Sequence, residues 1–309
     1  MRTIFKLTTL LLFIVGINVH AQKKASLGLN LETGKTYYQS SVSNIEMKQN
    51  INGQEVNITM DTDTKTAFQI LNEKEGVYQI KVTYPFLEVG MYVGPNLQSF
   101  SSAQNEDPFS KILSAMSHYS FELSLSKKGK ITDIRGLDDY WKKIDEETKD
   151  IPAMQKSQIL NQIKQSYGEK QLKTNMEMLT NIFPEEAVKK GSTWSKSSQY
   201  TISFTANIKR TFTVEKLSKT EIIINEVNHI ATDNTKEEYQ EINGMQMRYE
   251  MEGDNEATYT IDRTTGWIKN VNSTMKLDGF THINAGGQVM KVPLEFTTIT
   301  STNDNGLVK

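Results

Sequence analysis

Apolar and polar residues alternate along most of the chain after residue 33, and this period of two is the strongest constraint on its fold. Successive side chains of a β-strand point to opposite faces, so the alternation predicts strands with one buried and one wet face. Two Asn-Gly pairs, Asn52-Gly53 and Asn243-Gly244, lie between alternating runs. Asn-Gly is a strong hairpin signal, because a type I′ turn needs a positive φ angle at both central residues. The sequence therefore predicts a succession of antiparallel hairpins.

The period changes to that of a helix after residue 135. The first helical face is formed by Leu137, Tyr140, Trp141 and Ile144. These residues follow the i, i+3, i+4, i+7 spacing of an amphipathic helix. A second helical stretch lies between Pro152 and Pro184, and Gly168 is a candidate break within it. The fold class is therefore predicted to be α+β, with one or two curved, mainly antiparallel β-sheets and a helical insertion between two β-rich halves.

Five parts follow from this pattern: a signal peptide at 1–21, an N-terminal β-rich half at 22–135, a helical insertion at 136–190, a C-terminal β-rich half at 191–301 and a flexible tail at 302–309. The two halves share motifs, since Gly34-Lys35-Thr36-Tyr37 is echoed by Gly191-Ser192-Thr193-Trp194. Duplication explains this echo, and so does the common composition of short β-meanders. The pattern leaves open whether the halves form one sheet or two domains.

Three further segments have specific expectations. Residues 90–108 contain two Gly, two Pro and several Ser, which predicts a long loop. A short helix is expected at 109–116. The continuous apolar run Ile222-Ile223-Ile224 predicts a stretch that is buried on both faces.

The first 21 residues have the features of a secretory signal peptide. Arg2 and Lys6 precede an apolar run, and Val19-His20-Ala21 fits the small-residue rule for cleavage. The run is shorter than the roughly 20 apolar residues of a spanning helix, which disfavours an uncleaved anchor. We expect cleavage after Ala21, a mature N-terminus at Gln22, and a periplasmic or secreted protein that does not span the membrane.

Charge and composition exclude several function classes. The chain has 35 basic and 37 acidic residues, so it lacks the basic excess of a dedicated nucleic-acid binder. It has no Cys, which removes disulfides, thiolate metal sites and cysteine catalysis. His118, His229 and His282 show no metal-ligand spacing, and no Gly-x-Ser-x-Gly motif is present. The sequence thus identifies no catalytic residue, metal ligand or cofactor, and we expect a protein that is not an enzyme.

The best candidate surface is the Met-rich strand after the second Asn-Gly pair. Its tentative ligand-binding residues are Met245, Met247, Tyr249 and Met251, which alternate on one face. Met fills irregular gaps in cores and is also over-used on adaptable binding surfaces. One interpretation is plain core packing, and the other is a concave face that binds an apolar ligand. Trp141 and Ile144 would cover this face, completely if it is a core and in part if it is a pocket, and the 90–108 loop would be the lid of the pocket.

Several motifs resemble a family of secreted proteins of unknown function from Bacteroidota. They are Leu31-Glu32-Thr33-Gly34-Lys35-Thr36-Tyr37, the run from Phe121 to Lys130, Phe183-Pro184, the run from Val188 to Trp194, and Thr265-Gly266-Trp267. These motifs are strand starts and turns, so the resemblance is silent about activity. The expected topology is also similar to the curved sheets of periplasmic lipoprotein carriers, which is an analogy of fold alone.

Two functions remain open from the sequence. The first is a non-enzymatic, exported envelope protein that binds a lipid or other apolar ligand on a concave sheet face. The alternative is a structural or interaction module of an envelope protein complex, with no small-molecule ligand.

Overall fold

The computed structural model describes residues 24–51, 53–93, 96–201, 205–233, 239–242, 245–285 and 287–305. The predicted signal peptide lies outside these ranges, as do Asn52, Asn243 and Gly244. Within them the strands are β1 (Thr36–Ile51), β2 (Gln54–Lys74), β3 (Val77–Val93), β4 (Asn96–Ser101), β5 (Ser120–Ser126), β6 (Ile131–Arg135), β7 (Thr193–Thr201), β8 (Thr205–Leu217), β9 (Glu221–Thr232), β10 (Gln240–Ile242), β11 (Met245–Asp262), β12 (Ile268–Ala285) and β13 (Gln288–Asn303). The helices are α1 (Pro108–His118), α2 (Leu137–Glu147), α3 (Ala153–Tyr167) and α4 (Glu169–Thr180).

All of these strands belong to one antiparallel sheet. Its order is β6-β5-β3-β2-β1-β13-β12-β11-β9-β8-β7, with β4 added to β3 and β10 added to β11. The first and last long strands, β1 and β13, pair from Ser40↔Asn303 to Gln49↔Leu294. This pairing joins the two β-rich halves, so the question that the sequence left open is answered by one continuous sheet. The predicted α+β class with a mainly antiparallel, curved sheet is confirmed.

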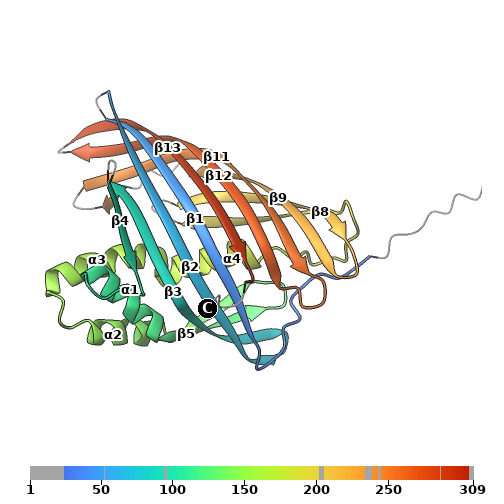
Figure 1. Cartoon of the computed structure of the whole chain (residues 1–309). Coiled ribbons are helices and arrows are strands. Elements are labelled where there is room, and N and C mark those ends of the chain that lie inside the picture. The colour runs from blue at the N-terminus through green and yellow to red at the C-terminus, as the bar shows by residue number, and fades with distance from the viewer. Residues whose placement is uncertain are drawn as a thin grey trace, which may run out of the picture.

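The sheet arches over the helices, which lie on its concave side (Figure 1). The larger hydrophobic core includes Val82, Ile112, Ile144, Phe183 and Tyr259, each at most 3% exposed. The helices cover only part of the long strands, and one end of the sheet extends beyond them (Figure 1). This end carries the β1–β2, β3–β4, β10–β11 and β12–β13 connections, which we call the hairpin tips. A second, smaller core lies on the same sheet and includes Met251, Leu277 and Leu294.

The hairpin and helix predictions are largely confirmed. Ile51 pairs with Gln54 across a two-residue connection, and Gly53 has a φ angle of +82° that a side chain would strain. Ile242 and Met245 pair across the second Asn-Gly position, which itself lies outside the described residues. Gly168 separates α3 from α4, as expected from its place in the helical pattern.

The predicted loop at 90–108 is wrong. Strand β3 continues to Val93, and Val93 pairs with Asn96 at the start of β4, so most of this segment is a hairpin. Helix α1 then begins at Pro108, where the Asp107 side chain caps the N–H groups of Phe109 and Ser110 at 2.9 Å. Pro108 therefore marks the start of α1, whereas Gly90 lies within β3, and no long lid is present in the described part of the segment.

Two smaller expectations also differ from the structure. Ile222 and Ile224 are buried while Ile223 is partly exposed, so β9 is an ordinary one-sided strand. The extra Ile on the outer face reflects β-propensity and needs no second core. Strand β13 extends to Asn303, so the first two residues of the predicted tail, Thr302 and Asn303, belong to the sheet. Thr302 is only 1% exposed.

The segment before β1, residues 25–31, packs against the end of the sheet opposite the hairpin tips. Leu27, Leu29 and Leu31 are at most 7% exposed there. The Leu29 N–H donates to the Lys127 carbonyl, and the Asn30 N–H donates to the Thr265 carbonyl. Because Lys127 and Thr265 belong to turns of the two different halves, this short segment is hydrogen-bonded to both halves at one end of the sheet.

The echoed motifs have the same local geometry. Gly34 and Gly191 have φ angles of +83° and +79°. The Gly34 N–H donates to the Ile70 carbonyl at 2.8 Å, and the Gly191 N–H donates to the Val214 carbonyl at 2.8 Å. Each half therefore starts its first strand by the same turn against its second strand.

Candidate functional site

The four predicted ligand-binding residues have different surroundings. Met245 is 46% exposed beside a hairpin tip, whereas Met251 is 2% exposed. Met251 belongs to the second core with Leu277 and Leu294, while Tyr249 packs against that core from its edge. The side chains on this face of β11 thus change from exposed to buried within seven residues.

Met247 and Tyr249 line a cavity of about 260 Å³, which neither Met245 nor Met251 reaches. Lys170 of α4, Gln199 of β7 and Asn207 of β8 lie on its other sides. Eight of the ten lining residues are polar or charged, so this cavity is suited to a polar group beside an apolar wall.

Trp141 and Ile144 do not cover the Met-rich face, contrary to the sequence-based expectation. Both belong to the larger core, where the ring of Trp141 contacts Tyr140 and the ring of Tyr140 contacts Phe121 of β5. The helix that approaches the second core is α4, whose Met178 packs against it. Periodicity defines the apolar face of a helix but not the strand that it meets, which explains the error.

A row of polar side chains crosses the concave face from strand to strand. We call it the polar belt, and it comprises Arg210, Asn228, Asn255, Ser273, Thr300, Ser43 and Thr62. Cross-strand pairs connect its members: Arg210↔Asn228, Asn228↔Asn255, Ser273↔Thr300, Thr300↔Ser43 and Ser43↔Thr62. Ser273 also donates a hydrogen bond of 2.7 Å to the Asn255 carbonyl oxygen Oδ1. The belt separates much of the larger core from the second core.

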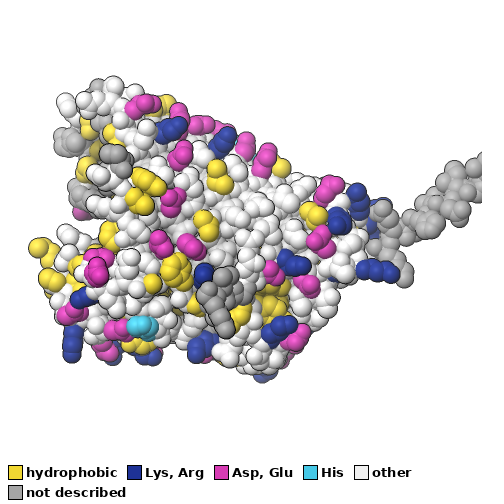
Figure 2. Space-filling model, in the orientation of Figure 1, with side chains coloured by type: hydrophobic (Ala, Val, Ile, Leu, Met, Phe, Trp, Pro, Cys, Tyr) yellow, Lys and Arg dark blue, Asp and Glu magenta, His cyan; other side chains and the backbone are white. Residues whose placement is uncertain are grey.

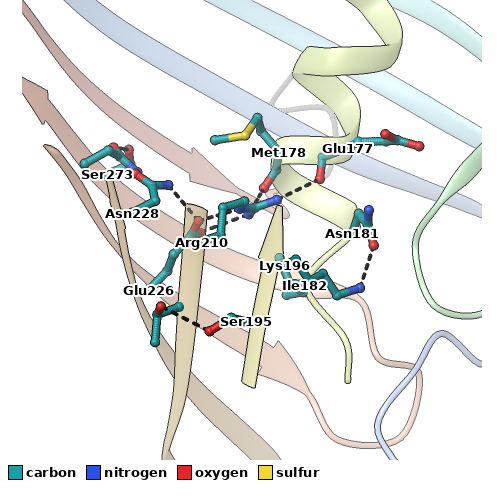
Figure 3. A network of polar contacts seen from close by, with 12 residues as sticks. Glu177, Met178, Asn181, Ile182, Ser195, Lys196, Arg210, Glu226, Asn228 and Ser273 are labelled. Carbon is teal, nitrogen blue, oxygen red and sulfur yellow. Dashed lines mark hydrogen bonds and ion pairs between the residues drawn. The ribbon is translucent and has the colours of Figure 1, made fainter. Parts of the chain in front are cut away.

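One end of the polar belt is fully buried beneath α4 (Figure 3). Arg210 donates to both carboxylate oxygens of Glu226, through Nε at 2.5 Å and Nη2 at 3.0 Å. It also reaches the Met178 carbonyl at 2.7 Å and the Glu177 carbonyl at 3.3 Å, at the C-terminal end of α4. A guanidinium at this position adds donors to carbonyls in the last turn and complements the negative end of the helix dipole. The Glu177 carbonyl also accepts from the N–H of Asn181.

The charges in this buried end neutralise one another. The Tyr259 hydroxyl donates to Glu226 Oε2 at 2.6 Å. Burial, reinforced by the negative charge of Glu226, raises the pKa of Tyr259, so its hydroxyl stays protonated and remains a donor. Burial opposes the charge of Arg210, yet its hydrogen bond to Glu226 raises the pKa of Arg210 above the ordinary value. The arrangement is an anchor for α4, with no proton poised for transfer.

The other end of the polar belt is partly exposed and uncharged. Ser43 shares a hydrogen bond of 2.9 Å with Thr300, and the neighbouring pair Ser41 and Thr302 shares one of 2.7 Å. Thr298, next on the same face of β13, has a buried Oγ1 with no partner among the described residues. This end therefore offers several hydroxyl groups that both donate and accept hydrogen bonds.

An apolar strip runs beside these hydroxyl groups, towards the hairpin tips. It consists of Ile45, Met47, Met60 and Phe296, which are all partly exposed. Cross-strand pairing places them together: Ile45 opposite Met60, and Met47 opposite Phe296. Met47 and Phe296 also pack against the second core. The apolar strip thus leaves hydrophobic area in contact with water, which a completed core would cover.

The histidines and acids of the described residues are arranged in pairs with one another rather than in a group that could bind a metal. Each histidine in the described ranges pairs with carboxylates: His118 with Glu147 at 2.7 Å, His229 with Asp254 at 3.0 Å and with Glu252 at 3.2 Å, and His282 with Glu250 at 2.8 Å. Among the described residues, no group of three or more His, Asp or Glu could hold a metal ion. Nor does any helix in the described ranges have the length and hydropathy to cross a membrane.

The polar belt was missed by the sequence-based reasoning. Its signal is present as Thr62-x-Thr64 and Thr298-x-Thr300-x-Thr302, where small hydroxyl residues replace apolar ones on the inward positions of a strand. Such residues are common on the outer faces of strands, so their inward direction is visible only once the register is known.

The chain matches one protein family and several solved structures. The family is described as a family of unknown function, DUF6263, and the match covers residues 75–268, more than half of the chain. No curated protein matches the chain by sequence.

The structural similarities are loose. An outer membrane channel of the COG4313 group from Pseudomonas putida aligns with a TM-score of 0.24 and 8% identity, over 89% of this chain and 97% of that chain. A DUF1329 family protein from Desulfovibrio piger aligns with a TM-score of 0.15 and 8% identity, over 90% and 89%. A domain from Vibrio parahaemolyticus, provisionally described as an outer membrane lipoprotein-sorting protein domain, aligns with a TM-score of 0.14 and 8% identity, over 87% and 87%. Superpositions at these TM-scores carry no argument about the function of this chain.

Proposed function

The chain belongs to DUF6263, a family of unknown function, and on that premise we propose that it is a non-enzymatic, exported envelope protein that binds an apolar ligand on the concave face of its sheet. The observation that carries the proposal is the apolar strip. Ile45, Met47, Met60 and Phe296 lie side by side on the concave face, and none of them is fully buried. A ligand laid along this strip would gain roughly 25 cal/mol for each Å² of apolar surface removed from water.

The composition of the outer face of the sheet supports a ligand site on the inner, concave face. The face shown in Figure 2 is largely uncharged polar, with scattered Lys, Arg, Asp and Glu side chains. It offers no continuous apolar area over the middle of β1 and β13, and its hydrophobic side chains gather near the helices and the strand tips. An apolar ligand would therefore be held on the inner face.

The Met-rich strand provides a matched pair of test variants. Met251→Glu places an unpaired carboxylate in the second core, where the native side chain is 2% exposed, and is expected to unfold the protein. Met247→Glu alters a cavity wall that water reaches and is expected to leave the protein folded. If the cavity belongs to the ligand site, Met247→Glu also loses the ligand that co-purifies with the wild type. Unfolding of both variants, detected by circular dichroism, would show that the whole strand is core.

Native mass spectrometry of the protein purified from its own envelope tests the binding itself. The expected result is a co-purifying lipid whose yield falls in a Met47→Gln variant. N-terminal sequencing of the same sample tests export, with Gln22 expected as the first residue. A chain that retains Met1 would contradict the expected cleavage.

A structural or interaction module is the second candidate, and the hairpin tips favour it. Leu97, Met245, Val289 and Met290 are between 46% and 53% exposed there. Exposed apolar side chains at one end of a molecule are typical of protein contacts. Co-purification of a stoichiometric protein without any lipid would support this candidate against the first.

A further inference from the structure

We infer that the partly exposed end of the polar belt is the subsite for an uncharged head group that bears hydroxyl groups. The ligand would then be a neutral amphiphile, such as a diacylglycerol, whose acyl chains lie along the apolar strip. This inference rests on the proposed function and adds the chemistry of the ligand. Three features of the described residues carry it: hydroxyl groups adjoining the strip, the absence of a charged side chain among them, and the unsatisfied hydroxyl of Thr298.

The hydroxyl groups adjoin the apolar strip in register. Ile45 pairs with Thr298, and Ser43 pairs with Thr300, so on β1 and β13 the change from apolar to hydroxyl occurs within one step of the same face. On β2 the same change occurs between Met60 and Thr62. An amphiphile has this division within one molecule, since its apolar part and its hydrogen-bonding part are directly joined.

The inward side chains of this region carry no charge. Positions 41, 43 and 45 of β1, 60, 62 and 64 of β2, and 296, 298 and 300 of β13 are Ser, Ile, Met, Thr or Phe. The charged pair Arg210 and Glu226 lies on β8 and β9, at least three strands from β13, and is internally neutralised. Phosphate recognition in proteins relies on Arg, Lys or clustered backbone N–H groups, so this region is unsuited to a phosphate head group.

The charges nearest to the belt on β2 would repel an anion. Asp61 and Asp63 flank Thr62 and point to the opposite face of the strand. Asp61 is held by the Asn44 side-chain amide at 2.8 Å. Lys65 is the nearest cation along the strand, and its ammonium lies over the Phe86 ring at 5.5 Å. A neutral head group avoids this negative background.

The partly exposed end of the belt also contains a polar atom whose bonding capacity is not used. The Oγ1 of Thr298 is buried and has no partner among the described residues. A buried hydroxyl without a partner is costly, so this atom favours a ligand that brings a hydrogen-bonding group to this end of the belt.

The test compares three probes that carry the same fluorescent acyl chain: a diacylglycerol, a phosphatidic acid and a plain alkyl chain. Binding to the mature wild-type protein is measured by fluorescence titration. The diacylglycerol is expected to bind at least about tenfold more tightly than the phosphatidic acid, because only the latter brings an unpaired charge to the belt. Equal affinity for these two lipids would overturn the inference.

Single hydroxyl deletions identify the subsite. Thr300→Val and Thr298→Val keep the side-chain shape and are each expected to weaken diacylglycerol binding about threefold to tenfold, the effect of one or more lost hydrogen bonds, while alkyl-chain binding is unchanged. Thr298→Val guards against a folding defect, since the native hydroxyl has no partner to lose. Thr297→Val is the matched control, because Thr297 is on the opposite face of the same strand.

Two outcomes separate failure of the inference from failure of the proposed function. If the alkyl probe binds and neither deletion affects the diacylglycerol, the belt is not a head-group subsite but an apolar ligand site remains. If no probe binds to the folded wild type, both the inference and the proposed function are wrong.

Discussion

Replacement of Arg210 by Met should detach α4 from the sheet and destabilise the protein strongly. The Arg210 and Glu226 side chains are only 3% and 0% exposed. Arg210→Met leaves the Glu226 carboxylate buried with Tyr259 and Asn228 as its remaining partners. It also removes the donors to the carbonyls of Glu177 and Met178.

The expected magnitude follows from these contacts. Removal of one partner from a buried ion pair typically costs about 3–5 kcal/mol, because the other charge remains without compensation. The double variant Arg210→Met/Glu226→Leu removes both charges and should recover at least about 2 kcal/mol relative to Arg210→Met, since a buried pair replaced by apolar groups is often nearly neutral. The recovery is incomplete because the Met178 carbonyl loses its hydrogen bond from Arg210, whereas the Glu177 carbonyl keeps the N–H of Asn181 as a donor.

Urea unfolding of the purified protein, followed by circular dichroism, measures these free energies. Hydrogen exchange of the α4 amides should rise in Arg210→Met before global unfolding, because the helix loses its contact with β8. The control is Lys216→Met, which breaks a surface pair with Glu221 at 3.0 Å and should cost less than about 1 kcal/mol. A cost below about 1 kcal/mol for Arg210→Met, or a double variant as unstable as the two single variants combined, would refute this account of the anchor.

Two further predictions concern the turns and the response to acid. Gly129→Ala would place a Cβ against the Thr180 carbonyl at the end of α4, whereas the Cβ of Gly53→Ala meets no atom within 4 Å. Both glycines have a positive φ angle, so Gly53→Ala should lower the free energy of unfolding by about 1 kcal/mol. Gly129→Ala should lower it by about 1–3 kcal/mol more, and urea unfolding measures both changes. The hydrogen bond from His282 holds the pKa of Glu250 below its ordinary value, so the carboxylate stabilises the fold fully above its unfolded-state pKa, and this contribution is lost as the pH falls through the lower folded-state value. Glu250→Gln should therefore flatten the loss of stability between neutral and acidic pH by less than about 1 kcal/mol, and an unchanged acid profile would show that the contact with His282 is not maintained in solution.

Local features of the fold were predictable because local physics determines them. Alternation identified the strands, and the Asn52-Gly53 pair predicted a two-residue connection that the pairing of Ile51 with Gln54 confirms. The helical spacing from Leu137 to Ile144 corresponds to α2, and Gly168 separates α3 from α4. The loop prediction for residues 90–108 was wrong because Gly and Pro occur in hairpin turns as well as in loops, and composition alone does not distinguish the two.

The candidate site was predictable only in part. Period two placed Met247 and Tyr249 on a common face, and both line the cavity beside the second core. The same period also placed Met245 and Met251 on that face, yet one is 46% exposed and the other 2%. Position along the strand relative to the helical layer makes this difference, and periodicity carries no information about that layer.

What the sequence determined by itself is most of the elements, the apolar faces of the alternating strands and many of the turns that connect neighbours, since each depends on residues close together in the chain. The tertiary structure alone decided that β1 pairs with β13, that α4 rather than α2 approaches the second core, and that inward Ser and Thr residues align into the polar belt. These depend on contacts between residues as far apart as Ser43 and Thr300, and on a register that shifts every side chain to the other face if it slips by one residue. Pairings across such distances follow from the packing of the whole sheet, which no local pattern specifies.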